Sequence, residues 1–171
     1  MSINFSSITP KEQVFEKVST YLHEQGLRVD KQDDNRPWGG FFVIDEADAE
    51  KFVQQYFSHL TLQDLKIAGK LSPKILVVAP EKRLSWQYHY RRAEIWKLIG
   101  GIAGVVTSNT DEEQDLKKLN IGDIIQLSQG ERHRLIGLSG WGIVAEIWRH
   151  TDPSNPSDEE DIVRLQDDFG R

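Results

Sequence analysis

The hydrophobic pattern of the chain changes near residue 74. Of all the features of the sequence, this change most restricts the folds that the chain can adopt. From Lys74 onward, apolar and polar residues alternate in short runs, as they do in half-buried strands. Turn signals separate these runs: Ala79-Pro80, Gly100-Gly101, Gln129-Gly130 and Ser139-Gly140. We expect strands at 74–79, 84–90, 94–99, 102–107, 122–127, 132–138 and 141–149. Short strands at such regular spacing favour an all-β sandwich or barrel.

The first third of the chain is expected to be helical. Thr9-Pro10-Lys11-Glu12 has the form of a capping box with Pro at the first helical position, and Gly26 provides a stop. A second helix is expected from near Asp48, after a turn and short strand at 36–44. The polar stretch 109–120 reads as a loop.

A length of 171 residues fits one domain with its own core. Within it we expect three parts: a helical cover with the first strand or strands at 1–73, a barrel at 74–150, and an acidic tail at 151–171 near the barrel mouth.

Composition removes several classes of function. The absence of Cys excludes disulfides, zinc knuckles, iron–sulfur clusters and thiol catalysis, so any metal must be held by His, carboxylate or amide oxygen. The net charge of −6 comes mostly from the tail, and a near-neutral body lacks the basic footprint of a nucleic-acid binder. The N-terminus has no signal-peptide pattern, and the longest apolar run, 75–79, is too short for a membrane span. We therefore expect a cytoplasmic protein with no nucleic-acid or membrane partner.

Polar residues in the expected strand 84–90 mark a candidate site. Ser85, Gln87 and His89 share one face by alternation, although this strand lies in the middle of the sheet region. Glu94 begins the next strand, which is expected to form a hairpin with the strand 84–90. His133 shares a face with Leu135 and Gly137 by alternation, so we expect its side chain to point inward.

These four side chains, Gln87, His89, Glu94 and His133, offer two oxygens and two nitrogens. Such a donor set suits a divalent transition metal: Zn, Mn, Fe, Co or Ni. The alternative is that they hydrogen-bond one another across the sheet, as buried polar groups do.

The spacing of these residues resembles the two cupin motifs. Gln87-x-His89-x4-Glu94-x6-Gly101 is similar to the first motif, with Gln in place of its first His. Gly122-x5-Ser128-x-Gly130-x2-His133-x3-Gly137 is similar to the second, with Ser in place of Pro and Gly in place of Asn. The resemblance implies an all-β core folded as a cupin double-stranded β-helix (jelly-roll barrel) with an N-terminal helical extension, and Gln87, His89, Glu94 and His133 as metal ligands.

A narrower resemblance covers residues 36–39 and 74–171. Arg36-Pro37-Trp38-Gly39, the segments 84–89 and 92–96, His133-Arg134-Leu135 and the terminus 160–171 resemble the cupin domain of type II mannose-6-phosphate isomerases (phosphomannose isomerases). The chain departs from the family at Tyr90, Arg91 and Ile95, which replace histidines. None of these positions is an expected metal ligand.

This resemblance implies a metal-dependent aldose–ketose isomerase. It would interconvert mannose 6-phosphate and fructose 6-phosphate, or a related phosphosugar, with one divalent transition metal, zinc being the first choice. It also suggests a homodimer. Non-catalytic sugar-binding or sensor cupins and Fe-dependent cupin oxygenases are the alternatives. In larger family members a mannose-1-phosphate guanylyltransferase precedes this domain, and at 171 residues we expect no nucleotidyl transfer.

Further site residues also come from the resemblance. Arg92 matches the family arginine beside the ligands and is the candidate catalytic residue, acting on the enediolate or the phosphate; its alternative role is a salt bridge to Glu94 or a tail acid. Arg164 and Arg171 are substrate-binding candidates, with surface pairing to an acid of 167–168 as the alternative. Trp38 is expected to stack on the sugar or to pack the barrel end. The sequence does not identify a general base.

Overall fold

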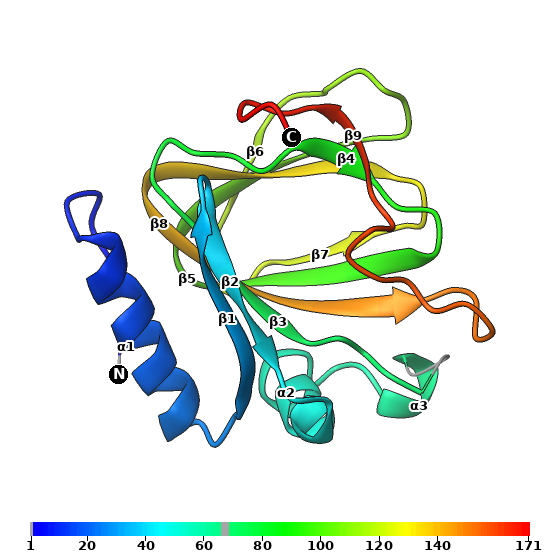
Figure 1. Cartoon of the computed structure of the whole chain (residues 1–171), viewed down its shortest axis with the longest axis horizontal. Coiled ribbons are helices and arrows are strands. Elements are labelled where there is room, and N and C mark those ends of the chain that lie inside the picture. The colour runs from blue at the N-terminus through cyan, green and yellow to red at the C-terminus, as the bar shows by residue number, and fades with distance from the viewer. Residues whose placement is uncertain (1, 66–68) are drawn as a thin grey trace.

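The computed structural model describes residues 2–65 and 69–171, and its main element is one curled antiparallel sheet (Figure 1). The path β1-β2-β3-β8-β4-β9 forms most of the sheet, and β5 joins it through β8 and carries β6 and β7. The elements are α1 (Lys11–Glu24), β1 (Val29–Arg36), β2 (Gly39–Ile44), the 3-10 helix η1 (Glu46–Asp48), α2 (Ala49–Tyr56), α3 (Leu62–Leu65), β3 (Lys74–Val78), β4 (Trp86–Tyr88), β5 (Arg92–Ser108), β6 (Lys117–Leu119), β7 (Ile124–Leu127), β8 (Arg132–His150) and β9 (Val163–Gln166).

Two long strands, β5 and β8, form the frame of the curl. They pair with each other twice, first from Arg92↔His150 to Gly101↔Gly142 and again from Ala103↔Gly137 to Ser108↔Arg132. The expectation of four separate strands here is wrong, because the glycines bend the strands instead of ending them. At the bend Gly101 has φ +70°, and a Cβ there would lie 1.8 Å from the carbonyl oxygen of Trp141. Only glycine lets the two backbones approach so closely.

Helices cover the outer face of the sheet. In α1, Val14, Phe15, Val18 and Leu22 are buried, as their helical spacing predicts. The Phe15 ring stacks on Phe42 of β2 at 5.3 Å. Each such side chain contributes about 1.5–3 kcal/mol by leaving water. The helices and the outer face of the sheet therefore share one hydrophobic cluster, which also takes in Phe52 of α2.

A second hydrophobic cluster lies inside the curl. It includes Trp38, Leu76, Trp96, Leu135 and Val144. Alternate residues of β3, β5 and β8 thus serve the two clusters, which is why both faces of these strands are largely apolar.

Some local expectations are wrong. The helix α1 forms, but the capping box does not: its N-cap is Pro10 without a side-chain hydrogen bond, and Thr9 Oγ1 bonds to Ser6 Oγ at 3.3 Å. The strands β1, β6 and β9 were not expected. All three are short or largely exposed, so they lack the apolar alternation that reveals a strand.

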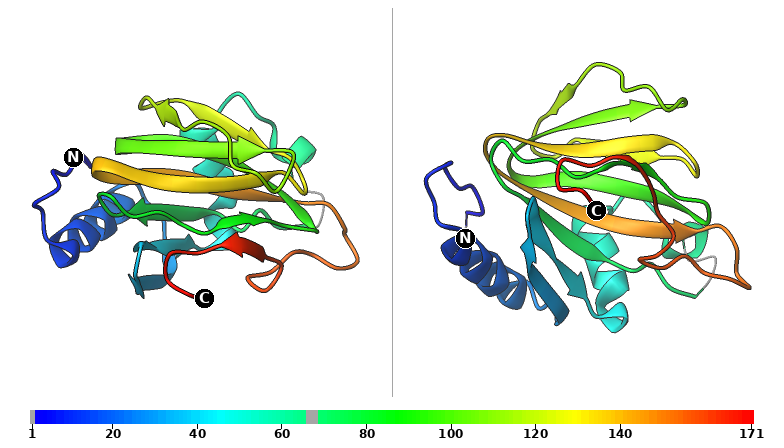
Figure 2. Two further views of the ribbon diagram at one scale, coloured as in Figure 1. Left: turned by 90° about the horizontal axis from the view of Figure 1, so that it is seen from above. Right: turned by 45° about the horizontal axis from the view of Figure 1, so that its top comes forward.

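The segment after β8 returns across the open side of the curl (Figures 1 and 2). Its strand β9 pairs with β4, from Trp86↔Gln166 to Tyr88↔Val163. Residues 157–161 thereby come to lie against the start of β5, with Ser157 and Asp161 buried. Among the described residues, no helix has the length and apolar character that crossing a membrane requires.

Candidate metal centre

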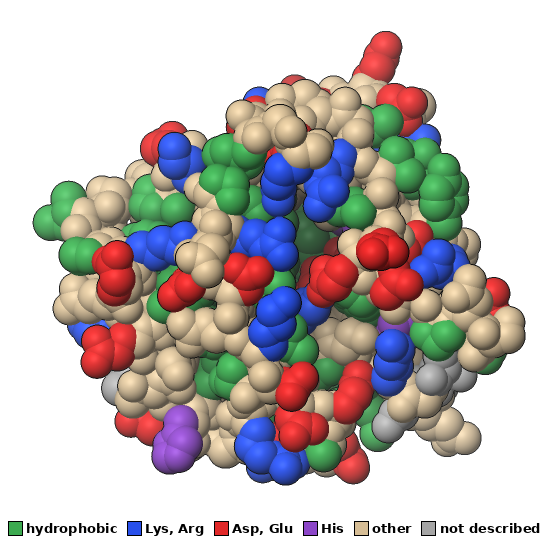
Figure 3. Space-filling view, in the orientation of Figure 1, with side chains coloured by type: hydrophobic (Ala, Val, Ile, Leu, Met, Phe, Trp, Pro, Cys, Tyr) green, Lys and Arg blue, Asp and Glu red, His purple; other side chains and the backbone are tan. Residues whose placement is uncertain are grey.

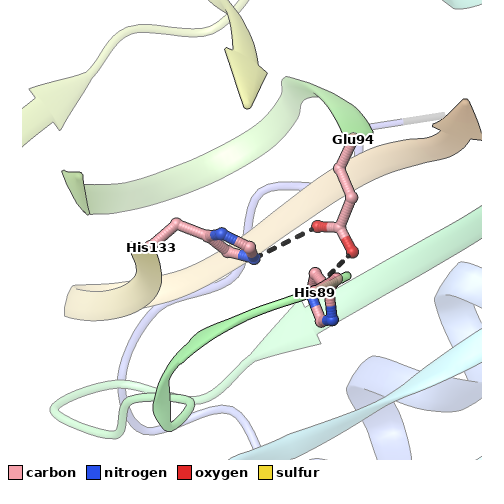
Figure 4. A group of neighbouring side chains, drawn as sticks. All are labelled: His89, Glu94 and His133. Carbon is pink, nitrogen blue, oxygen red and sulfur yellow. Dashed lines mark ion pairs between the residues drawn. The ribbon is translucent and has the colours of Figure 1, made fainter. Parts of the chain in front are cut away.

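Three side chains from distant parts of the chain meet inside the curl (Figure 4). His89 follows β4, Glu94 lies in β5 and His133 in β8, and each is about 2% exposed. Nε2 of His89 lies 3.1 Å from Oε1 of Glu94, and Nε2 of His133 lies 3.4 Å from Oε2. One ligand atom from each residue lies within 4.8 Å of the others.

Backbone carbonyls fix both imidazole rings in one orientation. Nδ1 of His89 donates to the carbonyl oxygen of Asp161 at 2.7 Å, and Nδ1 of His133 donates to that of Glu131 at 2.9 Å. A carbonyl oxygen only accepts, so in each neutral ring the proton is on Nδ1 and the lone pair is on Nε2. Metal-binding histidines are held in this way.

The three residues fit a divalent transition metal. Two ligand atoms about 2.1 Å from one ion lie about 3.0–3.4 Å apart at octahedral or tetrahedral angles. The two Nε2 atoms lie at such distances from the carboxylate, that of His89 3.1 Å from Oε1 and that of His133 3.4 Å from Oε2 of Glu94. Within residues 2–65 and 69–171, the buried Nε2 of His133 has no hydrogen-bond partner. A buried polar atom without a partner destabilises the fold. A metal ion that accepts the lone pair of this nitrogen would therefore stabilise the arrangement. His89, Glu94 and His133 are thus positioned to bind a metal.

Electrostatics keep Glu94 ionised. Burial alone would raise the pKa of its carboxyl group, but His89 and Arg92 together hold that pKa well below its usual value. The two rings differ: burial lowers the pKa of His89, whereas for His133 the nearby Glu94 carboxylate outweighs burial and the pKa is raised. The cluster therefore offers a carboxylate and, at His89, a neutral imidazole, which are the protonation states that metals bind.

Arg92 lies directly beside these three residues. Its Nε donates to Oε1 of Glu94 at 2.8 Å, and its Nη2 lies 3.3 Å from Nε2 of His89. Its guanidinium also stacks over the ring of Trp148 at 3.6 Å. The salt bridge to Glu94, one of the two roles considered for Arg92, is therefore present, and Arg92 also lines the adjacent pocket.

The returning C-terminal segment supports the same residues. Nη1 of Arg92 donates to Oγ of Ser157 at 2.8 Å, and Ser157 donates to Oδ2 of Asp161 at 2.6 Å. The Asp161 carboxylate accepts from the backbone N–H groups of Tyr90 and Arg91, which anchors the chain just after His89. Sequence reasoning did not assign a site role to Ser157 or Asp161, because their contacts form only when the tail folds back.

Gln87, the fourth expected ligand, lies in β4 opposite His133 and so projects from the same face of the sheet. Its Oε1 accepts from Oγ of Ser85 at 2.5 Å, and its side chain lines the pocket next to the cluster. The expected hairpin between the strands of Gln87 and Glu94 is wrong: β4 pairs with β8 and β9, whereas β5 pairs with β6, β7 and β8. The meeting of His89 with Glu94 arises from the curl of the whole sheet instead.

The side chains of Tyr90, Arg91 and Ile95, which replace family histidines, point away from the cluster. Tyr90 is 60% exposed, and Arg91 reaches Asp158 at 3.2 Å. Ile95 is buried in the outer cluster beneath the helices, on the face opposite to Glu94. The three substitutions therefore leave the residues around Glu94 in place.

A pocket of about 160 Å³ opens next to the cluster, and it coincides with the hollow in the face shown in Figure 3. Most of the charged residues that line it are positive: Arg36, Lys74, Arg92, Arg164 and Arg171. The lining carboxylates are Glu146 and Glu159. A pocket with this excess of positive charge attracts anions.

The structure places the substrate-binding candidates at this pocket. Arg171 lines it while also pairing with Asp167 at 2.8 Å, which was the alternative role considered for it. Arg164 has no carboxylate within 4.0 Å among the described residues; burial, followed by the charge of Arg171, lowers its pKa. Trp38 is 5% exposed, so it packs in the inner cluster and lines the pocket at the same time.

Glu146 is a functional candidate that the sequence analysis missed. It lies in β8 opposite Trp96 and is 5% exposed. Burial and the nearby charge of Glu94 raise the pKa of its carboxyl group to about 7. The signal was available: alternation within 141–149 puts this acid on the same face as Val144 and Trp148, where an apolar residue is expected.

Comparison with solved structures supports the fold. The chain is similar to the capsular polysaccharide assembling protein CapF from Staphylococcus aureus, with TM-score 0.52, 11% identity, and 82% of this chain and 34% of that chain covered. It is equally similar to vicilin from Corylus avellana (hazelnut), with TM-score 0.52, 14% identity and 81% and 36% covered. At these identities the likeness concerns the fold alone.

Two curated relatives are named mannose-1-phosphate guanylyltransferase. One, from Salmonella montevideo, is 24% identical over 168 residues, which is 98% of this chain and 29% of the relative. The other, from Escherichia coli strain K12, is 26% identical over 136 residues, which is 80% of this chain and 22% of the relative. The chain thus spans less than a third of the length of either relative.

A family model described as "Mannose-6-phosphate isomerase C-terminal" matches residues 55–167, about two thirds of the chain. The match contains the expected metal ligands, Arg92, Glu146 and Arg164. Together with the geometry of the centre, it shows that the chain belongs to the mannose-6-phosphate isomerase C-terminal family.

Proposed function

We propose that this chain is a metal-dependent aldose–ketose isomerase that interconverts mannose 6-phosphate and fructose 6-phosphate, or a related phosphosugar. One observation carries the proposal: the buried His89–Glu94–His133 cluster adjoins a pocket whose charged lining residues are mostly positive. In this proposal the curled sheet is the double-stranded β-helix of the cupins, and residues 1–73, 74–150 and 151–171 are cover, barrel and tail of one domain.

The ligand set we propose is Gln87, His89, Glu94 and His133, with zinc as the first candidate metal. Gln87 joins the set because it lies opposite His133 on the same face. A neutral Gln leaves Glu94 as the single charged ligand. A bound divalent ion would therefore retain net positive charge and act as a Lewis acid on the sugar oxygens.

The pocket offers the other groups that this chemistry needs. An aldose–ketose isomerisation passes through an enediolate, so positive groups must lie near the oxygens where charge develops. Arg92 lies between the cluster and the pocket and is suited to this role. The phosphate would take the rim, where Arg36, Arg164 and Arg171 gather, since guanidinium groups bind phosphate with two parallel hydrogen bonds.

The test begins with the metal. The purified chain is stripped, reloaded separately with Zn, Mn, Fe, Co or Ni, and assayed for mannose 6-phosphate conversion by a coupled reaction that detects fructose 6-phosphate. At least one metal should give turnover. The variant His133→Ala should lose it while remaining folded, and His59→Ala, which removes an exposed histidine after α2, should keep it.

Other results would replace the proposal. Consumption of dioxygen with Fe(II) in place of isomerisation would indicate an oxygenase. A rise in melting temperature with hexose phosphates, but no turnover with any metal, would indicate a non-catalytic sugar-binding protein.

A further inference from the structure

The pocket contains a buried carboxylate that neither the metal cluster nor the positive rim uses. Glu146 projects from β8 into the inner face of the curl and lines the pocket beside Arg92. We propose that the carboxylate of Glu146 is the catalytic base that carries the proton between C1 and C2 of the sugar. This inference rests on the proposed isomerase function and names the group that the sequence left unidentified.

Two indole groups hold Glu146 in place. Nε1 of Trp148 donates to its Oε1 at 3.0 Å, and Nε1 of Trp96 donates to its Oε2 at 2.8 Å. Each oxygen is thus fixed by one hydrogen bond and keeps a second lone pair. Indoles only donate, so they cannot take a proton from the carboxyl group or give it one. The two hydrogen bonds therefore fix the position of the carboxylate and leave it able to accept a proton from a substrate.

The other pocket carboxylate is less suited to the role. Glu159 has a side chain 67% exposed and forms a short ion pair with Lys74. Glu94 is bonded to Arg92 and faces the two histidines. Glu146 has no ion-pair partner within 4.0 Å in the part of the chain that the structure describes. It is therefore the pocket carboxylate that is both buried and free of a bound cation.

Charged groups on neighbouring strands adjust its basicity. Lys74 of β3 lies opposite it in register, and Arg92 and Glu94 belong to β5. Burial and Glu94 raise the pKa of Glu146 to about 7, whereas Lys74 and Arg92 act in the opposite direction. A base works best with a pKa near the operating pH. The raised pKa of Glu146 agrees with its role as the base, which is inferred from its position in the pocket.

The proton transfer balances with one carboxylate. Glu146 removes the proton from C2 of the aldose, the C–H electron pair becomes the C1=C2 double bond, and the carbonyl electrons move to O1. The hydroxyl proton then passes from O2 to O1. The C1=C2 electron pair next takes the proton from the Glu146 carboxyl group at C1, and the C2=O2 carbonyl forms. The carboxylate is regenerated, and the aldose has become the ketose.

The experiment uses the full, metal-loaded chain and the variant Glu146→Gln. We expect kcat for mannose 6-phosphate to fall by about 10²- to 10⁴-fold, the range for loss of a general base. Metal content and affinity for mannitol 6-phosphate, which has no carbonyl, should change by less than about threefold. In D₂O the wild type should place deuterium on carbon, and the variant should not. Glu112→Gln, an exposed acid in the loop after β5, is the matched control and should behave as wild type.

A second variant covers the case in which Glu146→Gln does not fold. Glu146→Asp keeps the charge but withdraws the carboxylate by one methylene, so kcat should fall at least about tenfold with affinity for mannitol 6-phosphate retained. Unchanged kcat in a folded variant of either kind overturns the assignment while the proposed function stands. A wild type that neither turns over nor incorporates deuterium with any metal overturns both.

Discussion

Replacing Arg92 by Met should destabilise the metal-free protein strongly. The Met side chain can still pack on Trp148, but the charge beside Glu94 is lost. Glu94 is about 2% exposed, and the Nε–Oε1 distance to Arg92 is 2.8 Å. Removing one partner of a buried ion pair costs about 3–5 kcal/mol, because the other charge remains buried without compensation. For 171 residues the unfolding entropy is about 0.36 kcal/mol/K, so the melting temperature should fall by about 8–14 °C.

The measurement is urea and thermal unfolding of the metal-free protein at pH 8, where Glu94 is ionised. Arg91→Met is the matched control. Arg91 bonds at 3.2 Å to Asp158, whose side chain is 58% exposed, and such a pair contributes about 0–1 kcal/mol. A loss below about 1 kcal/mol in Arg92→Met, similar to that in the control, would show that Arg92 does not compensate the Glu94 charge.

Three further results are expected. Asp161→Asn should weaken metal binding about 10–100-fold in a chelator competition, because the carboxylate anchors the backbone that carries His89; unchanged affinity would contradict this support. Because burial raises the folded-state pKa of Glu146 from 4.5 to about 7, its contribution to stability is complete below pH 4.5 and is lost as pH rises through 7. The urea midpoint of the metal-free protein should therefore fall over that range less steeply in Glu146→Gln than in wild type, and equal slopes would refute the pKa shift. Phe52→Ala should lower the unfolding free energy by about 3–5 kcal/mol in one cooperative transition, whereas a separate early transition would show that the helices do not share a core with the sheet.

The parts of the fold that follow a simple period were predictable from sequence. Val14, Val18 and Leu22 reveal α1 because one helical face is apolar, and short apolar runs between turn signals reveal the strands β3, β5 and β8. His133 was expected to point inward by parity alone, and it does. Its meeting with Glu94 required more than parity, since their strands come together through the curl.

What the sequence did not reveal depends on long-range pairing. The edge strand β1 is polar along most of its length, so no period marks it. β9 forms because β4 offers it a free edge. Asp161 reads as one acid in an acidic run, and its hydrogen bonds to the chain beside His89 span about 70 positions. Glu146 is different: its inward parity was visible, but its two indole partners were not.

The return of residues 157–166 to β4 also bears on the timing of assembly during synthesis. His89, Glu94 and His133 all leave the ribosome before the carbonyl of Asp161 and the hydroxyl of Ser157 that hold the ring of His89 and the guanidinium of Arg92. A nascent chain that has completed β8 can thus bury its two hydrophobic clusters while its ion-binding geometry is still loose. The arrangement of His89, Glu94 and His133 that suits a metal is then among the last features of the fold to be completed.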